Sequence, residues 1–512
     1  MQQATLASRY FFKLLANIAS VPVYLIMEAL LPRALGPAMY GNYNFATTLF
    51  LQLFGFLDMG TSTCFYNALS RRQDDVSLIR FYLGVSCLVL LIATIVALAL
   101  LWPPLGTLFM PNIPLWLAPL AMIFAYLTWI GRVLRSMNDA IGATIHSEIV
   151  RTTLSLTCVF LLVLLFLCDL LTIYTLFLQQ YLMLSAMALG FWFVTIKSYH
   201  NAHRTVLGSL THTEIKSMGK EFFAYSHPLF VQALLSFFML TLERWLLQWF
   251  NGSTEQGFFA LSQKVSMACF LFVSAMTPLI MREFSIAWGQ KDTQTMGRLL
   301  TRFAPLLYCI AAYFSCFTIA EAKTLVNLFG GAQFVEALIP VQIMALYPLH
   351  QAYGQLASSV FHATGRTHIL RNMTVAECCY GLLITWLLLA PSQYYGFGLG
   401  ATGLAIKTVF VQCITVNCYL WLASHCIPFG FWRNLLHQGL ALIVFLAVAY
   451  ISREITAFFP LGESFSLLRF LASGLLYTIG TCVLLLFFPQ ILGFSRTEFK
   501  ELVSRFLAHA WH

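Results

Sequence analysis

Five charged residues interrupt long apolar segments of this chain. Glu243 and Arg244 are adjacent in one segment, Lys264 lies in the next, and Glu28 and Lys407 interrupt two others. An ionised side chain at the centre of a bilayer costs at least about 2.5–3.5 kcal/mol. A guanidinium or ammonium group at such a position can bind phosphate, and a carboxylate can exchange a proton or neutralise a base.

The three bases among them are Arg244, Lys264 and Lys407. They lie at similar predicted depth, roughly 9–12 Å inside the outer boundary of their spans at about 1.5 Å per residue. Three bases against two acids leave a cationic excess, which predicts an anionic ligand such as a phosphate or diphosphate group. Arg33, after the first span, is a further expected contact of this ligand. The alternative interpretation is that Glu243 or Glu28 only neutralises a neighbouring base, and that Lys264 or Lys407 extends toward the outer headgroups.

The composition places these charges in a membrane. Of the 512 residues, 59% are apolar or aromatic and only 10% are charged, whereas a soluble protein carries about 25% charged residues. Apolar stretches long enough to span a bilayer recur from Tyr10 to Phe488. The thirteen cysteines form no CxxC pair, so we interpret them as small apolar residues and expect neither metal nor other cofactor. The sequence predicts an all-α polytopic membrane protein.

Hydropathy predicts about fourteen transmembrane helices. The first of them is expected to bend midway at Pro22 and to break at its outer end at Pro32. The predicted spans cover residues 10–31, 40–58, 79–102, 114–134, 149–168, 171–196, 223–250, 256–281, 303–321, 337–360, 373–390, 400–424, 435–452 and 466–488.

The distribution of basic residues predicts that both termini are cytoplasmic. Of the 29 lysines and arginines, 22 lie in the connections assigned to the inside, four lie in the outer loops, and three lie within spans. The net charge of +9 therefore reflects topology. Nucleic acid is not an expected partner, because the bases form no basic patch interleaved with aromatic residues.

Two halves of the sequence resemble each other. Gly36 and Gly41 follow the first span, and Gly252 and Gly257 follow the seventh with the same spacing. Further weak matches recur at nearly the same offset, so we predict two pseudo-symmetric six-helix lobes related by an axis along the membrane normal. The expected divisions are an N-terminal lobe at 1–210, a C-terminal lobe at 211–425, two additional spans at 426–488, and a cytoplasmic amphipathic tail helix at 489–512.

Several motifs resemble the polysaccharide transporter family. They are PRALGPAMYGNYNF after the first span, LERWLLQWFNGSTEQGFFAL across the seventh and eighth, LVNLFGGAQF and HATGRTHILRN around the tenth, and GFGLGATGLA before the twelfth. The resemblance covers most of residues 10–425. Within this family, the chain resembles the Wzx-type flippases of the multidrug/oligosaccharidyl-lipid/polysaccharide exporter (MOP) superfamily. The acidic-Arg motif of that family corresponds to Glu243 and Arg244.

The resemblance implies a monomeric, non-enzymatic transporter of the bacterial inner membrane. Its implied substrate is an undecaprenyl-diphosphate-linked oligosaccharide for O-antigen lipopolysaccharide, capsule or exopolysaccharide, moved from the cytoplasmic to the outer leaflet by alternating access. Membrane lipids, a glycan polymerase and chain-length proteins are the implied partners. Twelve spans are usual for the Wzx branch, whereas fourteen resemble the lipid II flippases and some capsule exporters, so the substrate stays open.

Two other functions remain open from the sequence. A drug or metabolite exporter of the same superfamily shares the lobes but binds organic cations, and an acidic cavity is expected there. A scaffold of glycan assembly has no transport activity of its own. An enzyme is disfavoured, because polytopic glycosyltransferases and polymerases carry long outside loops with charged clusters, whereas the outside loops here are short and nearly uncharged.

Overall fold

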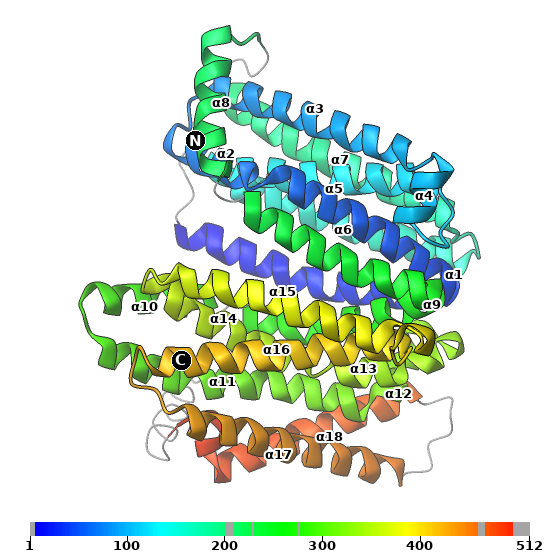
Figure 1. Ribbon diagram of the computed structural model, residues 1–512, viewed down its shortest axis with the longest axis vertical. Coiled ribbons are helices and arrows are strands. Elements are labelled where there is room, and N and C mark those ends of the chain that lie inside the picture. The colour runs from blue at the N-terminus through cyan, green and yellow to red at the C-terminus, as the bar shows by residue number, and fades with distance from the viewer. Residues whose placement is uncertain (1–5, 201–207, 228–229, 275–276, 459–465, 495–512) are drawn as a thin grey trace. The chain divides into compact units, whose positions relative to one another are not determined.

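The computed structural model describes residues 6–200, 208–227, 230–274, 277–458 and 466–494, and every regular element in these ranges is a helix (Figure 1). The predicted all-α class is confirmed. The chain forms two compact units, Met1–Gly257 and Phe258–His512. The predicted amphipathic tail lies, from residue 495 on, outside the described residues.

The helices are as follows. The first unit holds α1 (Leu6–Asp58), α2 (Thr61–Arg71), α3 (Val76–Ala99), α4 (Pro103–Phe109), α5 (Leu117–Ala140), α6 (Thr144–Leu167), α7 (Ile173–His200), α8 (His212–Ser226) and the larger part of α9 (Phe230–Ser274). The second unit continues with α10 (Thr277–Gly289), α11 (Thr293–Ala320), α12 (Ala322–Gly330), η2 (Ala332–Ala337), α13 (Leu338–Met344), α14 (Tyr347–Ala363), α15 (Thr367–Leu389), η3 (Ser392–Tyr394), α16 (Gly400–Ser424), α17 (Phe431–Ala457), α18 (Ser466–Phe487) and η5 (Pro489–Leu492).

Ten segments of the described chain are long and apolar enough to cross a membrane. They are Val76–Ala99, Leu117–Ala140, Thr144–Leu167, Ile173–His200, Thr293–Ala320, Ala332–Ala363, His368–Leu389, Gly400–Ser424, Phe431–Ala457 and Leu467–Phe487. The other four predicted spans fall mainly in α1 and α9, each of which bends at a glycine. The chain is a multi-pass membrane protein.

The bend in α1 lies at Gly36 rather than at Pro32. Gly36 has φ 71° and ψ 167°, and the helix runs without a break through the proline until that point. Helix α9 bends in the same way at Gly252, which has φ 83° and ψ −175°. A positive φ with extended ψ is a conformation that is nearly restricted to glycine. The proline prediction was wrong in position, because proline is tolerated where neighbouring groups satisfy the backbone, whereas this conformation requires glycine.

In the first unit, α1 packs against α5 and α6, and α7 packs against both of these helices. At one end of α5 and α6, the carboxylate of Glu148 accepts hydrogen bonds from two arginines. Arg135 Nε donates to Oε1 at 2.8 Å, and Arg151 Nε donates to Oε2 at 2.8 Å. Glu148 is only 1% exposed. This bridge ties the two helices together and leaves a net positive charge.

Helix α8 lies at the start of the predicted C-terminal lobe and packs on α2 and α3 of the first unit. Arg72 donates two hydrogen bonds to the Glu221 carboxylate at 2.8 and 2.9 Å. At the other end, Glu214 accepts hydrogen bonds from the Thr211 side chain at 2.7 Å and the Ser77 hydroxyl at 3.1 Å. These hydrogen bonds lower the pKa of Glu214 below its usual range. The predicted seventh span therefore starts too early at 223, because residues 223–226 belong to α8.

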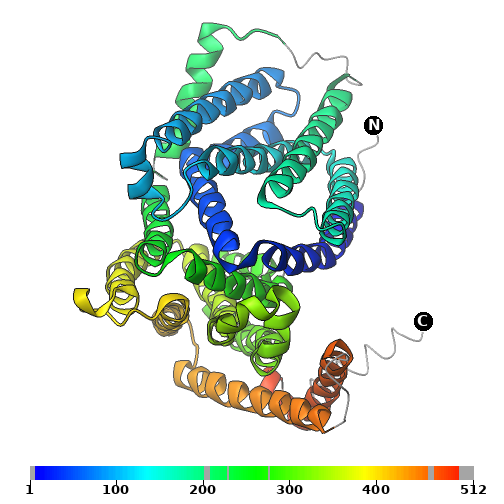
Figure 2. The same cartoon turned by 90° about the vertical axis from the view of Figure 1, so that its right-hand side faces the viewer.

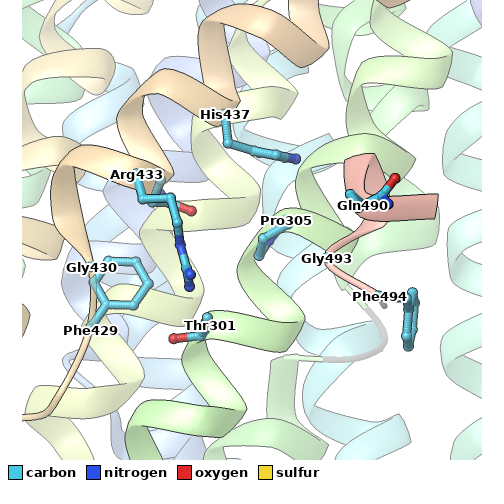
Figure 3. A pocket seen from close by; sticks show the side chains of 10 residues that line it. Thr301, Pro305, Phe429, Gly430, Arg433, His437, Gln490, Gly493 and Phe494 are labelled. Atoms are coloured by element: carbon cyan, nitrogen blue, oxygen red, sulfur yellow. The ribbon is translucent and has the colours of Figure 1, made fainter. Parts of the chain in front are cut away.

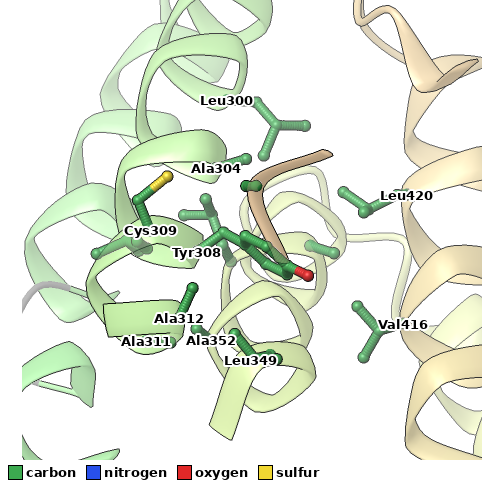
Figure 4. Close-up of a cluster of buried hydrophobic side chains, with 14 of the residues drawn as sticks. Leu300, Ala304, Tyr308, Cys309, Ala311, Ala312, Leu349, Ala352, Val416 and Leu420 are labelled. Carbon is green, nitrogen blue, oxygen red and sulfur yellow. The ribbon is translucent and has the colours of Figure 1, made fainter. Parts of the chain in front are cut away.

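In the second unit, α11 lies between α14 and α17, and α17 packs on α18. Figure 4 shows the core around Tyr308, and Figures 1 and 2 show α17 and α18 as neighbours. The buried face of α11 is rich in small side chains: Ala304, Ala311, Ala312, Ser315 and Cys316. Such residues allow close helix packing in lipid.

The outward face of α18 is apolar, with exposed Leu468, Leu471, Leu475, Ile479 and Leu486, as expected for a lipid-facing helix.

Candidate functional site

Glu28 is buried in the segment of α1 that precedes the bend at Gly36, and it accepts a hydrogen bond from a tyrosine in the segment that follows the bend. Its side chain is 7% exposed, and Tyr40 donates a hydrogen bond to Oε2 at 3.2 Å. Twelve residues of straight helix would separate the two by about 18 Å. The contact therefore depends on the bend at Gly36, which turns the chain back toward Glu28.

Arg244 occupies the corresponding position in α9. It precedes Gly252 by eight residues, as Glu28 precedes Gly36 by eight. The guanidinium group interacts electrostatically with the neighbouring Glu243 and with Tyr40. Tyr40 therefore donates a hydrogen bond to a carboxylate of the first predicted repeat and interacts electrostatically with a cation of the second. Equivalent positions of the two predicted repeats thus carry opposite charges.

Hydrogen bonds fix the segment of α9 that carries Arg244. Thr241 donates to the Gln52 side chain of α1 at 2.7 Å, and the indole of Trp245 donates to the Leu108 carbonyl at 2.7 Å. One turn further on, Gln248 donates to the Pro111 carbonyl at 3.1 Å. An apolar cavity of 310 Å³ lies beside this segment. Its lining includes Leu49, Leu108, Phe109, Phe237, Phe238, Thr241, Leu242 and Trp245.

The two bent helices approach each other at the second glycine of each pair. A Cβ atom on Gly41 would lie 2.8 Å from the backbone nitrogen of Gly257 and 2.9 Å from the carbonyl carbon of Ser253. A Cβ atom on Gly257 would lie 3.0 Å from the carbonyl carbon of Pro37. The contact is reciprocal, because each second glycine meets the residue that follows the other bend.

The remaining predicted site residues lie elsewhere. Arg33 is exposed near the end of the first segment of α1. Lys264 is half-buried in the second segment of α9, and Lys407 is 6% exposed on α16. Both lysines belong to the second unit. Burial of Lys407 argues against the alternative in which its ammonium group extends to the headgroups.

Tyr40 is the site residue that the sequence reasoning missed. Its signal was present in the YGNYNF motif, where a tyrosine directly precedes Gly41. In the same motif, Tyr43 donates to the Gln180 side chain at 3.1 Å, and Asn44 donates to the Tyr40 carbonyl at 2.8 Å. The motif therefore supplies polar partners inside an apolar bundle, not only the small residues that a helix crossing needs.

This arrangement suits ion binding rather than covalent catalysis. A guanidinium group binds phosphate oxygens through charge-assisted hydrogen bonds, and a carboxylate beside a phenol can gain and lose a proton. Within the described ranges, no group of three His, Cys, Asp or Glu side chains is arranged to hold a metal ion.

Comparison with solved structures identifies the fold. The lipid II flippase MurJ in an inward closed conformation matches with a TM-score of 0.68 at 15% identity, over 93% of this chain and 99% of that chain. A mutant of the Vibrio cholerae MATE transporter VcmN matches with a TM-score of 0.53 at 18% identity, over 82% and 96%. A MOP superfamily transporter from Pyrococcus furiosus matches with 0.50 at 14% identity, over 80% and 95%. The chain therefore has the fold of flippases and exporters.

The family model described as polysaccharide biosynthesis protein matches residues 6–281. The chain belongs to this family. None of the curated proteins matches it in sequence.

Proposed function

We propose that this protein is a flippase for an undecaprenyl-diphosphate-linked oligosaccharide, such as an O-antigen, capsule or exopolysaccharide repeat unit. It moves this substrate from the cytoplasmic to the outer leaflet of the bacterial inner membrane by alternating access, with both termini cytoplasmic. The observation that carries the proposal is the Arg244 guanidinium, which interacts electrostatically with Tyr40 inside the helices of a polysaccharide biosynthesis family member. The fold shared with MurJ supports it.

Arg244 has the chemistry that a diphosphate requires. Its planar guanidinium can donate two parallel hydrogen bonds to phosphate oxygens, which a lysine cannot do with the same geometry. The neighbouring apolar cavity lined by Leu49 and Phe237 offers a surface for part of the lipid. Lys264 and Lys407 remain predicted contacts of an anionic ligand.

The charge of the substrate supplies a driving force. An inside-negative potential favours outward movement of negative charge by about 2.3 kcal/mol per charge per 100 mV. A carboxylate such as Glu243 or Glu28 supplies a second means of coupling, by exchange of a proton.

The proposal is tested by glycan export in cells that depend on this chain. We expect Arg244→Ala to reduce export strongly at unchanged protein level, and Arg244→Lys to restore only part of it. Arg282→Ala is the matched control, because Arg282 also lies beside a glutamate, Glu283, but its side chain is 74% exposed. Normal export by both Arg244→Ala and Lys264→Ala at normal protein level would show that the assignment of an anion site is wrong.

A further inference from the structure

Exposed aromatic side chains gather on the connection between α15 and α16 in the second unit, and residues 390–399 are named the aromatic loop here. Tyr394 and Phe397 are exposed, and Tyr395 is 93% exposed. The loop joins two segments that are long and apolar enough to cross a membrane, His368–Leu389 and Gly400–Ser424, so it lies at a membrane boundary. No charged residue occurs between Glu377 and Lys407.

Tyr395 has a backbone conformation that tyrosine rarely adopts. Its φ of 60° and ψ of 28° lie in the left-handed region, which is unfavourable for residues with a β-carbon and is visited mainly by glycine, asparagine and aspartate. Because the ring is almost fully exposed, packing within the second unit does not offset this cost. Strained residues of this kind persist where they serve a contact. The non-glycine residues with positive φ in the described chain are Met59, Asn112, Asp169, Lys291 and Tyr395.

The backbone of the aromatic loop is paired with the end of α15. The indole of Trp386 donates to the Tyr394 carbonyl at 3.2 Å. Carbonyls at a helix C-terminus have no partner within the helix, and the loop supplies partners here. A backbone segment enters the apolar part of a bilayer only when its polar groups are satisfied. Three consecutive N–H groups donate at 2.8 Å each, from Phe397 to Leu387, from Gly398 to Ala390 and from Leu399 to Leu388.

The aromatic loop continues the exposed apolar face of α15. Leu383, Trp386 and Leu387 are exposed near the end of that helix, which packs within its unit on α16 and α14. The centre of the Trp386 ring lies 6.5 Å from that of Tyr394. A spanning helix with exposed leucines on its outward face is covered by lipid, and tryptophan and tyrosine favour the level of the headgroups. The loop therefore extends a lipid-facing surface to the boundary of the bilayer.

The opposite ends of α15 and α16 are basic instead. Arg366 and Arg371 are exposed at the start of α15. Shortly after α16, Arg433 extends along a polar cavity of 340 Å³ toward Thr301 (Figure 3). Lysine and arginine concentrate on one side of a membrane, whereas tyrosine and tryptophan occur at both boundaries. The aromatic loop thus marks the boundary far from these bases.

We propose that the aromatic loop inserts into the bilayer at the boundary between the headgroups and the acyl chains. The rings of Tyr395 and Phe397 contact acyl chains, and the Tyr395 hydroxyl stays among the headgroups, because tyrosine has an apolar ring and a polar end. The loop holds the α15–α16 hairpin at a fixed depth. Its partner is the lipid surface, and the inference does not depend on the proposed transport function.

The test places a tryptophan in the loop of the full-length protein and measures its fluorescence in phosphatidylcholine nanodiscs. Tyr395→Trp keeps an aromatic ring at an exposed position, and subtraction of the wild-type emission removes the contribution of the eleven native tryptophans. Lipid with bromine on its acyl chains quenches an indole in the bilayer, and iodide quenches one in water. We expect brominated lipid to remove most of the added emission and iodide to remove little of it.

Lys291→Trp is the matched control. Lys291 also has a positive φ, of 58°, and is exposed in the turn between α10 and α11, but the charged Asp292 adjoins it. Iodide should quench this indole and brominated lipid should not. Phe397→Trp, at a second position of the aromatic loop, should behave as Tyr395→Trp does. The proposal is overturned if iodide quenches Tyr395→Trp as strongly as Lys291→Trp. It is also overturned if neither quencher reaches the Tyr395→Trp indole, because protein or glycan then covers the loop.

Discussion

The crossing of α1 and α9 at Gly41 and Gly257 makes a sharp prediction about one methyl group. In Gly41→Ala the new Cβ would lie 2.9 Å from the Ser253 carbonyl carbon and 2.8 Å from the Gly257 nitrogen. Both neighbours are backbone atoms, so no side-chain rotation relieves the clash. The helices themselves must move.

The size of the effect follows from these distances. Carbon atoms in favourable contact lie about 3.5–4.0 Å apart, so the two backbones must separate by at least about 0.6 Å. Overpacking of this kind costs about 1–3 kcal/mol, and more where the backbone cannot adjust. Because Tyr40 directly precedes Gly41, the same displacement disturbs the hydrogen bond between Tyr40 and Glu28. Transport should therefore fall more than stability alone explains.

The assay compares thermal unfolding midpoints and flipping rates of purified variants. Gly55→Ala is the control, because it lies on the same helix and a Cβ there meets no atom within 4 Å. We expect Gly55→Ala to be neutral or slightly stabilising. In the double variant Gly41→Ala with Gly257→Ala, the second methyl should cost less than it does alone, because the first has already separated the helices. A Gly41→Ala protein with wild-type midpoint and flipping rate would refute the close crossing.

Three further predictions concern polar contacts. Tyr40→Phe removes the donor to buried Glu28 and should destabilise the protein by about 1–3 kcal/mol, measured by thermal unfolding, whereas an unchanged midpoint would show that the hydrogen bond is unimportant. Glu148→Ala leaves Arg135 and Arg151 facing each other and should lower the free energy of unfolding by an amount near the lower end of about 3–5 kcal/mol, because Arg135 is 27% exposed. The double variant Arg135→Ala with Glu148→Ala should recover part of this lost stability. Hydrogen bonds from Thr211 and Ser77 lower the pKa of Glu214. The stability that these hydrogen bonds contribute is fully present above the ordinary carboxyl pKa and is lost as pH falls through the lowered pKa. The protection factors of the α8 amides, which compare the measured exchange rate with the intrinsic rate at each pH, should then fall in acid for wild type but stay constant over that range for Glu214→Gln.

Hydropathy was enough to predict the long apolar helices of the described chain, because a bilayer requires about 20 apolar residues for each span. It was less able to predict where helices bend. Pro32 has the stronger local signal, yet the chain bends at Gly36, since only the φ of glycine is positive there at little cost. The repeated glycine spacing contained this information, but the spacing alone does not show which glycine bends and which permits close packing.

The charged site was predictable in part. Glu28, Glu243 and Arg244 were selected because charges are rare in apolar segments. In the first unit, Tyr40 donates a hydrogen bond to Glu28 and interacts electrostatically with Arg244. The tyrosine itself was not predictable, because its contact with Glu28 exists only after the chain has turned at Gly36.

The most direct test of the account is flipping of a labelled undecaprenyl-diphosphate-linked oligosaccharide in proteoliposomes. Wild-type protein and Arg282→Ala are expected to expose the label on the opposite leaflet at the same rate, and Arg244→Ala is expected to be at least about tenfold slower. An inside-negative potential should accelerate outward flipping by wild type. Equal rates for Arg244→Ala and wild type would contradict the role given to Arg244, and the absence of flipping by well-folded wild-type protein would contradict the proposed function.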